Sequence, residues 1–304
     1  MRLRELGAAS LRERLSTDGI ALRTGPVTVR LRTRLQAVAE DIATLYADQE
    51  LVPQSGFCDF DAQVDAVPGL RRWVRPQAEF LLDGISPFKP MPLQHASATL
   101  EWGLNWCVST HCHRFIIIHA AAVERGGLVA VLPAPPGSGK STLCAALVQR
   151  GWRLLSDELT LIDPATGSLV PLARPVSLKN QSIEIIQRFA PQAVFGPVTR
   201  DTVKGSVAHM RPPQDSVLAA NRPARLGWVV FPRYRAECPL QAQAMPRSTA
   251  FMQLIDNAFN YHLHGRAGFD CLAGLMEQAR CLRLEYAQLD EAIAFFDELA
   301  AVPR

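Results

Sequence analysis

The chain has few lysines, few aromatic residues, no long apolar run and no paired spacing among its cysteines. No stretch of about 18 consecutive apolar residues occurs, so we expect no transmembrane helix. The 7 cysteines are scattered, which argues against a disulfide framework and indicates reduced thiols in the cytoplasm. With 32 basic and 29 acidic residues the charge is nearly balanced, so we expect neither nucleic acid nor a membrane as the main partner.

Lysine supplies only four of the 32 basic residues, namely Lys89, Lys140, Lys179 and Lys204. Against that background, a lysine within a phosphate-binding motif stands out. The rest of the composition is typical of a globular protein, with 48% hydrophobic and 20% charged residues. A chain of 304 residues can bury a sizeable core without disulfides or metal, and it allows two domains or one large one.

Proline and glycine residues indicate a domain boundary near residue 95. Before it, Val27–Leu31 alternates like a strand, and Leu35–Tyr46 has the apolar spacing of a helix. Three prolines within Pro87–Pro92 predict an extended linker. We therefore predict an N-terminal α+β region over residues 1–95 and a second, larger domain over residues 96–304.

The part of the chain after residue 95 predicts strands that alternate with helices. We expect strands at Phe115–Ile118 (ending at His119), Leu128–Leu132, Arg153–Leu155, Leu159–Ile162 and Leu282–Tyr286, and helices at Lys140–Gln149 and Leu289–Leu299. This order is typical of an α/β core.

A glycine-rich loop lies between the second of these strands and the first of these helices. The segment Ala134–Thr142 matches the phosphate-loop pattern G-x-x-x-x-G-K-[ST], except that Ala134 replaces the first glycine. Glycines allow the backbone amides to surround phosphate oxygens, the lysine reaches the β- and γ-phosphates, and the hydroxyl after it binds Mg²⁺. The candidate ATP-binding residues are Pro136, Gly137, Ser138, Gly139, Lys140, Ser141 and Thr142.

A pair of acidic residues follows the glycine-rich loop at a shorter distance than in many P-loop proteins. Asp157 and Glu158 come directly after the next predicted strand, with Asp157 only 17 residues beyond Lys140. If that strand pairs beside the strand before the loop, both carboxylates reach the phosphates at the sheet edge. One acid can then orient or deprotonate an acceptor hydroxyl, and the other can hold metal. His119, at a neighbouring strand end, can reach the same place; a structural role is the alternative.

These residues together resemble the C-terminal catalytic domain of HPr kinase/phosphorylase, and more closely the branch called HPr kinase-related kinase A. The resemblance implies an α/β fold with a P-loop kinase core of the HPr kinase/PEP carboxykinase type, with ATP and Mg²⁺ as cofactors. It implies that His119, Lys140, Asp157 and Glu158 are catalytic, with Asp157 as the proton acceptor. It also implies a metal site made by Ser141, Asp157 and Glu158.

For HPr kinase itself the similarity covers residues 110–170, whereas for the related branch it extends over nearly the whole chain. The branch segments are Trp102–Trp106, Arg174–Asn180 and Lys204–Pro213. Three features depart from HPr kinase: Glu158 as the second acid, Ala134 in the loop, and the absence of the downstream L-E-x-R-G-L-G signature. The last departure argues against HPr as the substrate and against phosphorylase activity.

We expect an ATP-dependent kinase that phosphorylates a hydroxyl acceptor, with a serine of a protein or peptide favoured by the resemblance. A small-molecule kinase and a nucleotide-binding regulatory scaffold are the alternatives. Lys179, Lys204 and Arg211 are candidate acceptor-binding residues, with ordinary surface positions as the alternative. The resemblance also suggests a small PqqD-like peptide-binding protein as a partner, and it leaves a homo-oligomer open.

Overall fold

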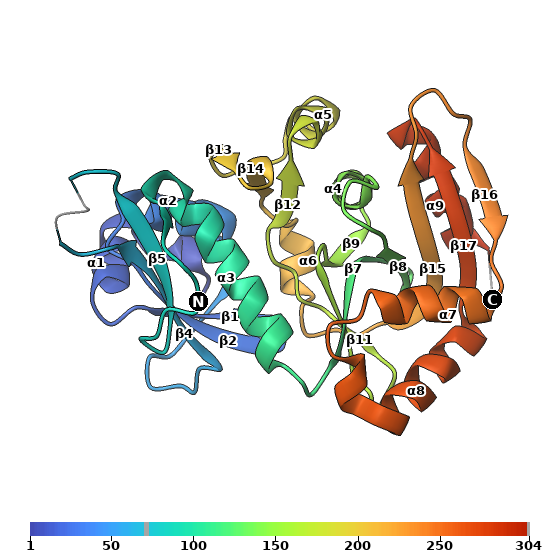
Figure 1. Cartoon of the computed structure of the whole chain (residues 1–304), viewed down its shortest axis with the longest axis horizontal. Helices are drawn as coiled ribbons and strands as arrows, with labels where there is room; N and C mark the ends of the chain where they lie inside the picture. Colours follow the sequence, from blue (N-terminus) through green and yellow to red (C-terminus); the bar gives the residue numbers. More distant parts are fainter. Residues whose placement is uncertain (70–72, 303–304) are drawn as a thin grey trace.

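The computed structural model describes residues 1–69 and 73–302 and has a mixed α/β fold (Figure 1). The first sheet has the order β3-β1-β2-β4-β5-β6, with strands at Glu50–Val52, Ile20–Thr24, Val27–Arg32, Phe60–Ala66, Gln77–Leu82 and Met91–Pro92. Helices α1 (Ala8–Ser16), α2 (Gln36–Leu45) and α3 (Ala96–His111) accompany it. Within the described ranges, no helix is both long and apolar enough to cross a membrane.

Helix α3 packs against the first sheet, although it follows residue 95. Gly103 of α3 lies so close to β5 that a Cβ atom there would be 2.3 Å from the ring of Phe80. The predicted linker is wrong in part, because Met91 and Pro92 pair with β5 and Phe88 packs its ring on Trp106. The proposed division between residues 95 and 96 stays a prediction.

The second sheet has the order β11-β10-β7-β8-β15-β17-β16, with β9 also paired to β7. Its strands are β7 (Ile116–Arg125), β8 (Leu128–Pro133), β9 (Arg153–Ser156), β10 (Leu159–Ile162), β11 (Leu169–Val170), β15 (Arg225–Tyr234), β16 (Gln241–Ala244) and β17 (Arg280–Tyr286). The hydrophobic patterns that predict strands at residues 128–132, 153–155, 159–162 and 282–286 are confirmed.

Strand β7 is longer than expected, and it pairs with the strand before the acidic pair. The strand does not end at His119 but continues to Arg125, because it forms a hairpin with β8 across Gly126 and Gly127, both with positive φ. The strand before the acidic pair, β9, pairs with β7 rather than with β8. One edge of β7 is long enough to accept β10 at its first half and β9 at its second half.

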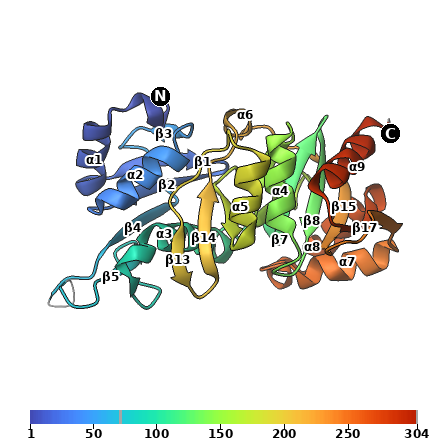
Figure 2. The ribbon, with the colours of Figure 1, turned by 90° about the horizontal axis from the view of Figure 1, so that it is seen from above.

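Helices cover both faces of the second sheet, as Figure 2 shows from above. Because side chains alternate along a strand, Ala121 and Val123 of β7 face α4 (Lys140–Gln149) and α9 (Leu289–Ala301). Ile118 and Ala120 face the opposite core, under α7 (Arg247–Asp256) and α8 (Tyr261–Gln278). The predicted helices at residues 35–46, 140–149 and 289–299 are confirmed as α2, α4 and α9.

A small third sheet lies between the two larger ones (Figures 1 and 2). Its order is β12-β14-β13, with strands Val176–Lys179, Gly205–Met210 and Thr199–Thr202, and it is followed on the chain by α6 (Gln214–Leu218). Helix α5 (Gln181–Phe189) leaves β12 and packs beside α4. This sheet carries Lys179 at the end of β12 and Lys204 in the turn between β13 and β14.

Candidate active site

The loop between β8 and α4 has a backbone that needs glycine at two positions. Gly137 and Gly139 have φ of +85° and +87°, in the left-handed region that other residues rarely adopt. Two tyrosines hold the loop: the Tyr286 hydroxyl donates to the Gly139 carbonyl at 3.2 Å, and the Tyr234 amide donates to the Ser138 carbonyl at 2.9 Å. Helix α4 begins directly afterwards at Lys140, so the unpaired amides of its first turn face the loop.

The candidate nucleotide-binding residues are continuous along this loop and turn. Pro136 and Gly137 are exposed, whereas Ser138, Gly139, Ser141 and Thr142 are partly buried. Lys140 is buried, and its Nζ donates a hydrogen bond to the backbone carbonyl of Asp157 at 2.8 Å. The lysine therefore joins the first turn of α4 to the acidic pair after β9.

Asp157 is a buried carboxylate with one free oxygen. Its Oδ2 accepts a hydrogen bond from the amide of Ser177 at 3.1 Å. Its Oδ1 is buried and has no hydrogen-bond partner among the described residues. Burial raises the pKa of Asp157, and the positive charge of Lys140 opposes that rise only in part. The Asp157 carboxylate thus has few hydrogen-bond donors around it, and its Oδ1 can receive a proton or a cation.

Glu158 has the opposite electrostatic environment. Its Oε2 accepts a hydrogen bond from Asn105 Nδ2 at 2.5 Å, and its Oε1 lies 3.7 Å from Lys179 Nζ. Burial acts to raise the pKa of Glu158, but Lys179, Lys140 and then Lys204 outweigh it and the pKa is lowered. Neighbouring acids with pKa values shifted in opposite directions suit two different roles.

His119 reaches this cluster from the middle of β7. Its register partner on β10 is Leu159, the residue after Glu158, so the strand pairing brings the imidazole beside the acids. The ring packs on Phe259, with the ring centroids 5.8 Å apart. Burial, followed by the charge of Lys140, lowers the pKa of His119 to about 4, so the imidazole is neutral at pH 7.

The third sheet brings two lysines to the same place. Lys179 faces Glu158, and Lys204 lies over the ring of Trp102 on α3, with Nζ 5.2 Å from the ring centroid. Burial and then the charge of Lys179 lower the pKa of Lys204, while Glu158 opposes this. The candidate site is thus bordered on one side by α3, and the two lysines give it an excess of positive charge.

Arg211 does not join the other predicted site residues. Its Nε lies 3.9 Å from Asp48 Oδ2, and its side chain lines a cavity of about 530 Å³ beside Gln149 and Gly151. Those two residues stand at the C-terminal end of α4, roughly 15 Å along the helix from Lys140. Arg211 follows β14 at the end remote from Lys204, so adjacency in sequence did not bring it to the lysines.

Four neighbours of the candidate site are not indicated by the sequence motifs: Asn105, Arg174, Glu101 and Ser177. Nothing in the spacing of these residues indicates that Asn105 contacts Glu158 or that Arg174 contacts Asn105. They meet only because α3 and the chain before β12 pack together around the acidic pair.

No group of three or more histidine, cysteine or acidic side chains gathers as a metal site in the described ranges. Ser141, Asp157 and Glu158 offer hydroxyl and carboxylate oxygens, the ligands that Mg²⁺ prefers, and Asp157 Oδ1 is without a partner in this part of the chain. A site with few protein ligands fits Mg²⁺ that is completed by phosphate oxygens and water.

Comparison with known proteins adds little. No protein-family model matches the chain, and no curated protein is similar to it in sequence. Among solved structures, the Hpr(Ser) kinase/phosphatase from Coxiella burnetii matches with 12% identity and a TM-score of 0.27, over 60% of this chain and 96% of that one.

Proposed function

We propose that the chain is an ATP-dependent kinase that transfers the γ-phosphoryl group of ATP to a hydroxyl acceptor. One observation carries this proposal. Lys140, the acidic pair Asp157–Glu158, His119 and Lys179 come from four separate segments, and they meet at the N-terminus of α4 next to a glycine loop. Phosphoryl transfer needs this combination of positive charge, amide donors and acids.

The loop and Lys140 are proposed to bind the phosphates. The amides of the loop and of the first turn of α4 supply donors, and the helix end adds positive potential. The Nζ of Lys140 donates to the Asp157 carbonyl, and it can exchange that partner for a phosphate oxygen. Mg²⁺, when bound by Ser141, Asp157 and Glu158, would neutralise charge on the phosphates.

Asp157 is proposed to accept the proton of the acceptor hydroxyl. Burial raises its pKa, which makes it a stronger base than an exposed aspartate, and its Oδ1 has no partner in the described part of the chain. The proton would thus move from the hydroxyl to Oδ1. His119, being neutral, would position the acids or the phosphate without adding charge.

Lys179 and Lys204 are proposed to bind the acceptor, because they line the side of the cluster that faces α3. We leave Arg211 out of this subsite, since it lies by Asp48. A serine of a protein or peptide is the proposed acceptor. For a peptide acceptor, a PqqD-like peptide-binding protein is the proposed partner that delivers it. We place this activity in the cytoplasm, and assembly as a homo-oligomer is compatible with it.

The test is label transfer from γ-labelled ATP, with Mg²⁺, to the proteins and metabolites of a cell extract, with Lys140→Ala as the control. We expect a labelled acceptor with the wild-type chain only, and no phosphoserine on purified HPr. Labelling of a metabolite instead of a protein would select the small-molecule kinase. Tight ATP binding without turnover on any acceptor would select the regulatory scaffold and overturn the proposal.

A further inference from the structure

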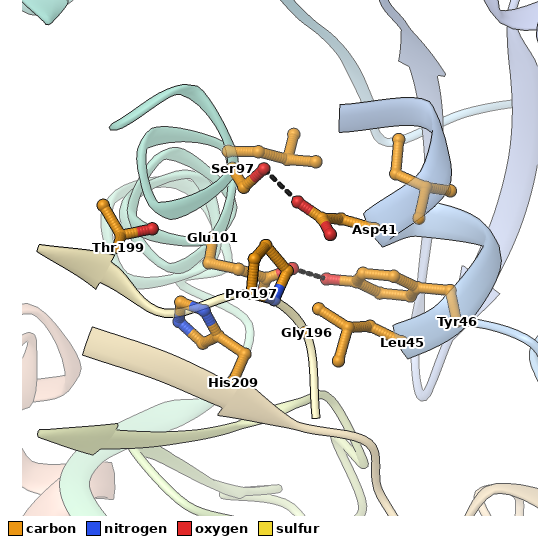
Figure 3. A pocket seen from close by; sticks show the side chains of 11 residues that line it. Asp41, Leu45, Tyr46, Ser97, Glu101, Gly196, Pro197, Thr199 and His209 are labelled. Carbon is orange, nitrogen blue, oxygen red and sulfur yellow. Dashed lines mark hydrogen bonds between the residues drawn. The ribbon is translucent and has the colours of Figure 1, made fainter. Parts of the chain in front are cut away.

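A series of buried and partly buried hydrogen bonds leads from Tyr46, the residue after helix α2, to Glu158. The Tyr46 hydroxyl donates to Glu101 Oε1 at 2.7 Å, a contact drawn in Figure 3. Arg174 donates to Glu101 Oε2 at 2.8 Å and, through its other terminal nitrogen, to Asn105 Oδ1 at 2.6 Å. Asn105 then donates to Glu158 Oε2. This series of hydrogen bonds ends at Glu158, a residue of the candidate active site.

The chemistry of these groups fixes which of them donates and which accepts along the series. A guanidinium group only donates hydrogen bonds, so the oxygen of the Asn105 amide must face Arg174. The amide nitrogen must then face Glu158, where it donates to a carboxylate oxygen. The reverse orientation would set donors against the guanidinium and an oxygen against the carboxylate. Arg174 therefore decides which way the amide of Asn105 points.

Glu101 holds Arg174 in turn. Their side chains are only 5% and 7% exposed, so both charges are removed from water. Apolar side chains of similar size often stabilise a core as well as such a pair does, so stability alone does not account for it. A planar guanidinium held at two edges by Glu101 and Asn105 is, however, a rigid means of orientation.

We infer that Asn105 is a positioning residue, locked by Arg174 and Glu101, which aims the Glu158 carboxylate at the phosphate loop. With Oε2 held by Asn105, Oε1 is the oxygen left toward Lys179 and the bound ligand. Asn105 and Glu101 lie on α3, which packs on the first sheet, so the packing of that helix supports this side of the site. The catalytic part of this inference rests on the proposed function; the orientation of Asn105 does not.

The orientation is tested by NMR without any activity. The chain has five asparagines, so side-chain ¹⁵N labelling of asparagine gives five amide signals, and Asn105→Leu identifies one of them. The Glu101 side chain touches Arg174 and makes no hydrogen bond to the Asn105 side chain, so we expect Glu101→Gln to move the Asn105 side-chain signal only through Arg174. Tyr46→Phe removes only one hydroxyl and should move it less. Asn260, which is buried and bonded to Phe115 and Ile117, should not respond.

The catalytic role is tested by kinetics. Asn105→Leu and Glu101→Gln should lower kcat, or raise the Mg²⁺ concentration needed for half-maximal rate, by about 10- to 100-fold, as for other residues that orient ligands. KM for ATP should change less. The matched control is Thr33→Val, which removes the hydrogen bond that the Thr33 hydroxyl donates to the Val64 carbonyl and the one that it accepts from the Leu35 amide. Thr33 makes no contact with the residues of the series, so this variant should keep the wild-type kcat.

The outcomes separate the two proposals. An Asn105 signal that ignores both Glu101→Gln and Tyr46→Phe in folded protein would overturn the inference. A wild-type rate and Mg²⁺ dependence in Asn105→Leu would overturn the positioning role while leaving the kinase intact. A responsive Asn105 signal in a protein without ATP turnover would support the orientation and overturn the proposed function.

Discussion

Gly137 and Gly139 offer a matched pair of substitutions in the candidate phosphate loop. Their φ values, +85° and +87°, are nearly the same, so alanine suffers similar strain on φ at both positions. Replacing glycine by alanine also lowers the conformational entropy of the unfolded chain by the same amount at both positions. The space around them differs: a Cβ atom at Gly137 meets nothing within 4 Å, whereas one at Gly139 lies 2.7 Å from Tyr286 Oη and 2.9 Å from Tyr234 Cβ.

The difference in space sets the expected magnitudes. Gly137→Ala should lower the free energy of unfolding by about 1–2 kcal/mol, the cost of the left-handed conformation. Gly139→Ala should add an overpacking cost of about 1–3 kcal/mol. Tyr286 cannot easily yield, because its ring is only 1% exposed and its hydroxyl is bonded to this loop. We therefore expect roughly 2–5 kcal/mol for Gly139→Ala.

Urea unfolding followed by both tryptophan fluorescence and far-ultraviolet circular dichroism measures the two free energies. Coincident transitions by the two probes would justify a two-state treatment. If the two variants agree within about 0.5 kcal/mol, the usual error of such comparisons, the contact between Gly139 and the tyrosines is wrong. A larger loss in Gly137→Ala would refute the reasoning in the same way.

Three further predictions concern the ionisable groups of the site. Lys140→Ala should abolish phosphoryl transfer and weaken ATP binding in calorimetry; wild-type transfer would contradict the loop assignment. Asp157→Asn should retain ATP affinity and lose kcat, whereas Glu158→Gln should raise the Mg²⁺ requirement, and steady-state kinetics that show neither effect would refute this division. The folded-state pKa of His119, about 4, lies below its ordinary 6.5, so the unfolded chain takes up a proton first as the pH falls. Stability should thus be lost between pH 6.5 and 4, and His119→Gln should lose less over that window in urea titrations; an unchanged pH dependence would count against burial of the imidazole.

Local signals in the sequence determined much of this protein. The helix predicted at residues 140–149 has those bounds in the structure, because glycines before it and Gly151 after it mark both ends. Short apolar runs likewise predict the strands at residues 128–132 and 153–155, which are present in the structure. Asp157 and Glu158 directly follow a strand, so the position of that strand also fixes the position of the two acids. The sequence therefore indicates the candidate site at that strand end.

The tertiary structure decided which segments meet. Apolar runs do not encode which strand they pair with, so the pairing of β9 with β7 and the length of β7 were not evident from the sequence. Lys204 reaches the site and Arg211 does not, because the two lie at opposite ends of β14. Asn105 meets Glu158 through the packing of α3 beside the acidic pair, 53 residues away in sequence. Such contacts depend on long-range packing, which fixes the directions of side chains that a local pattern leaves open.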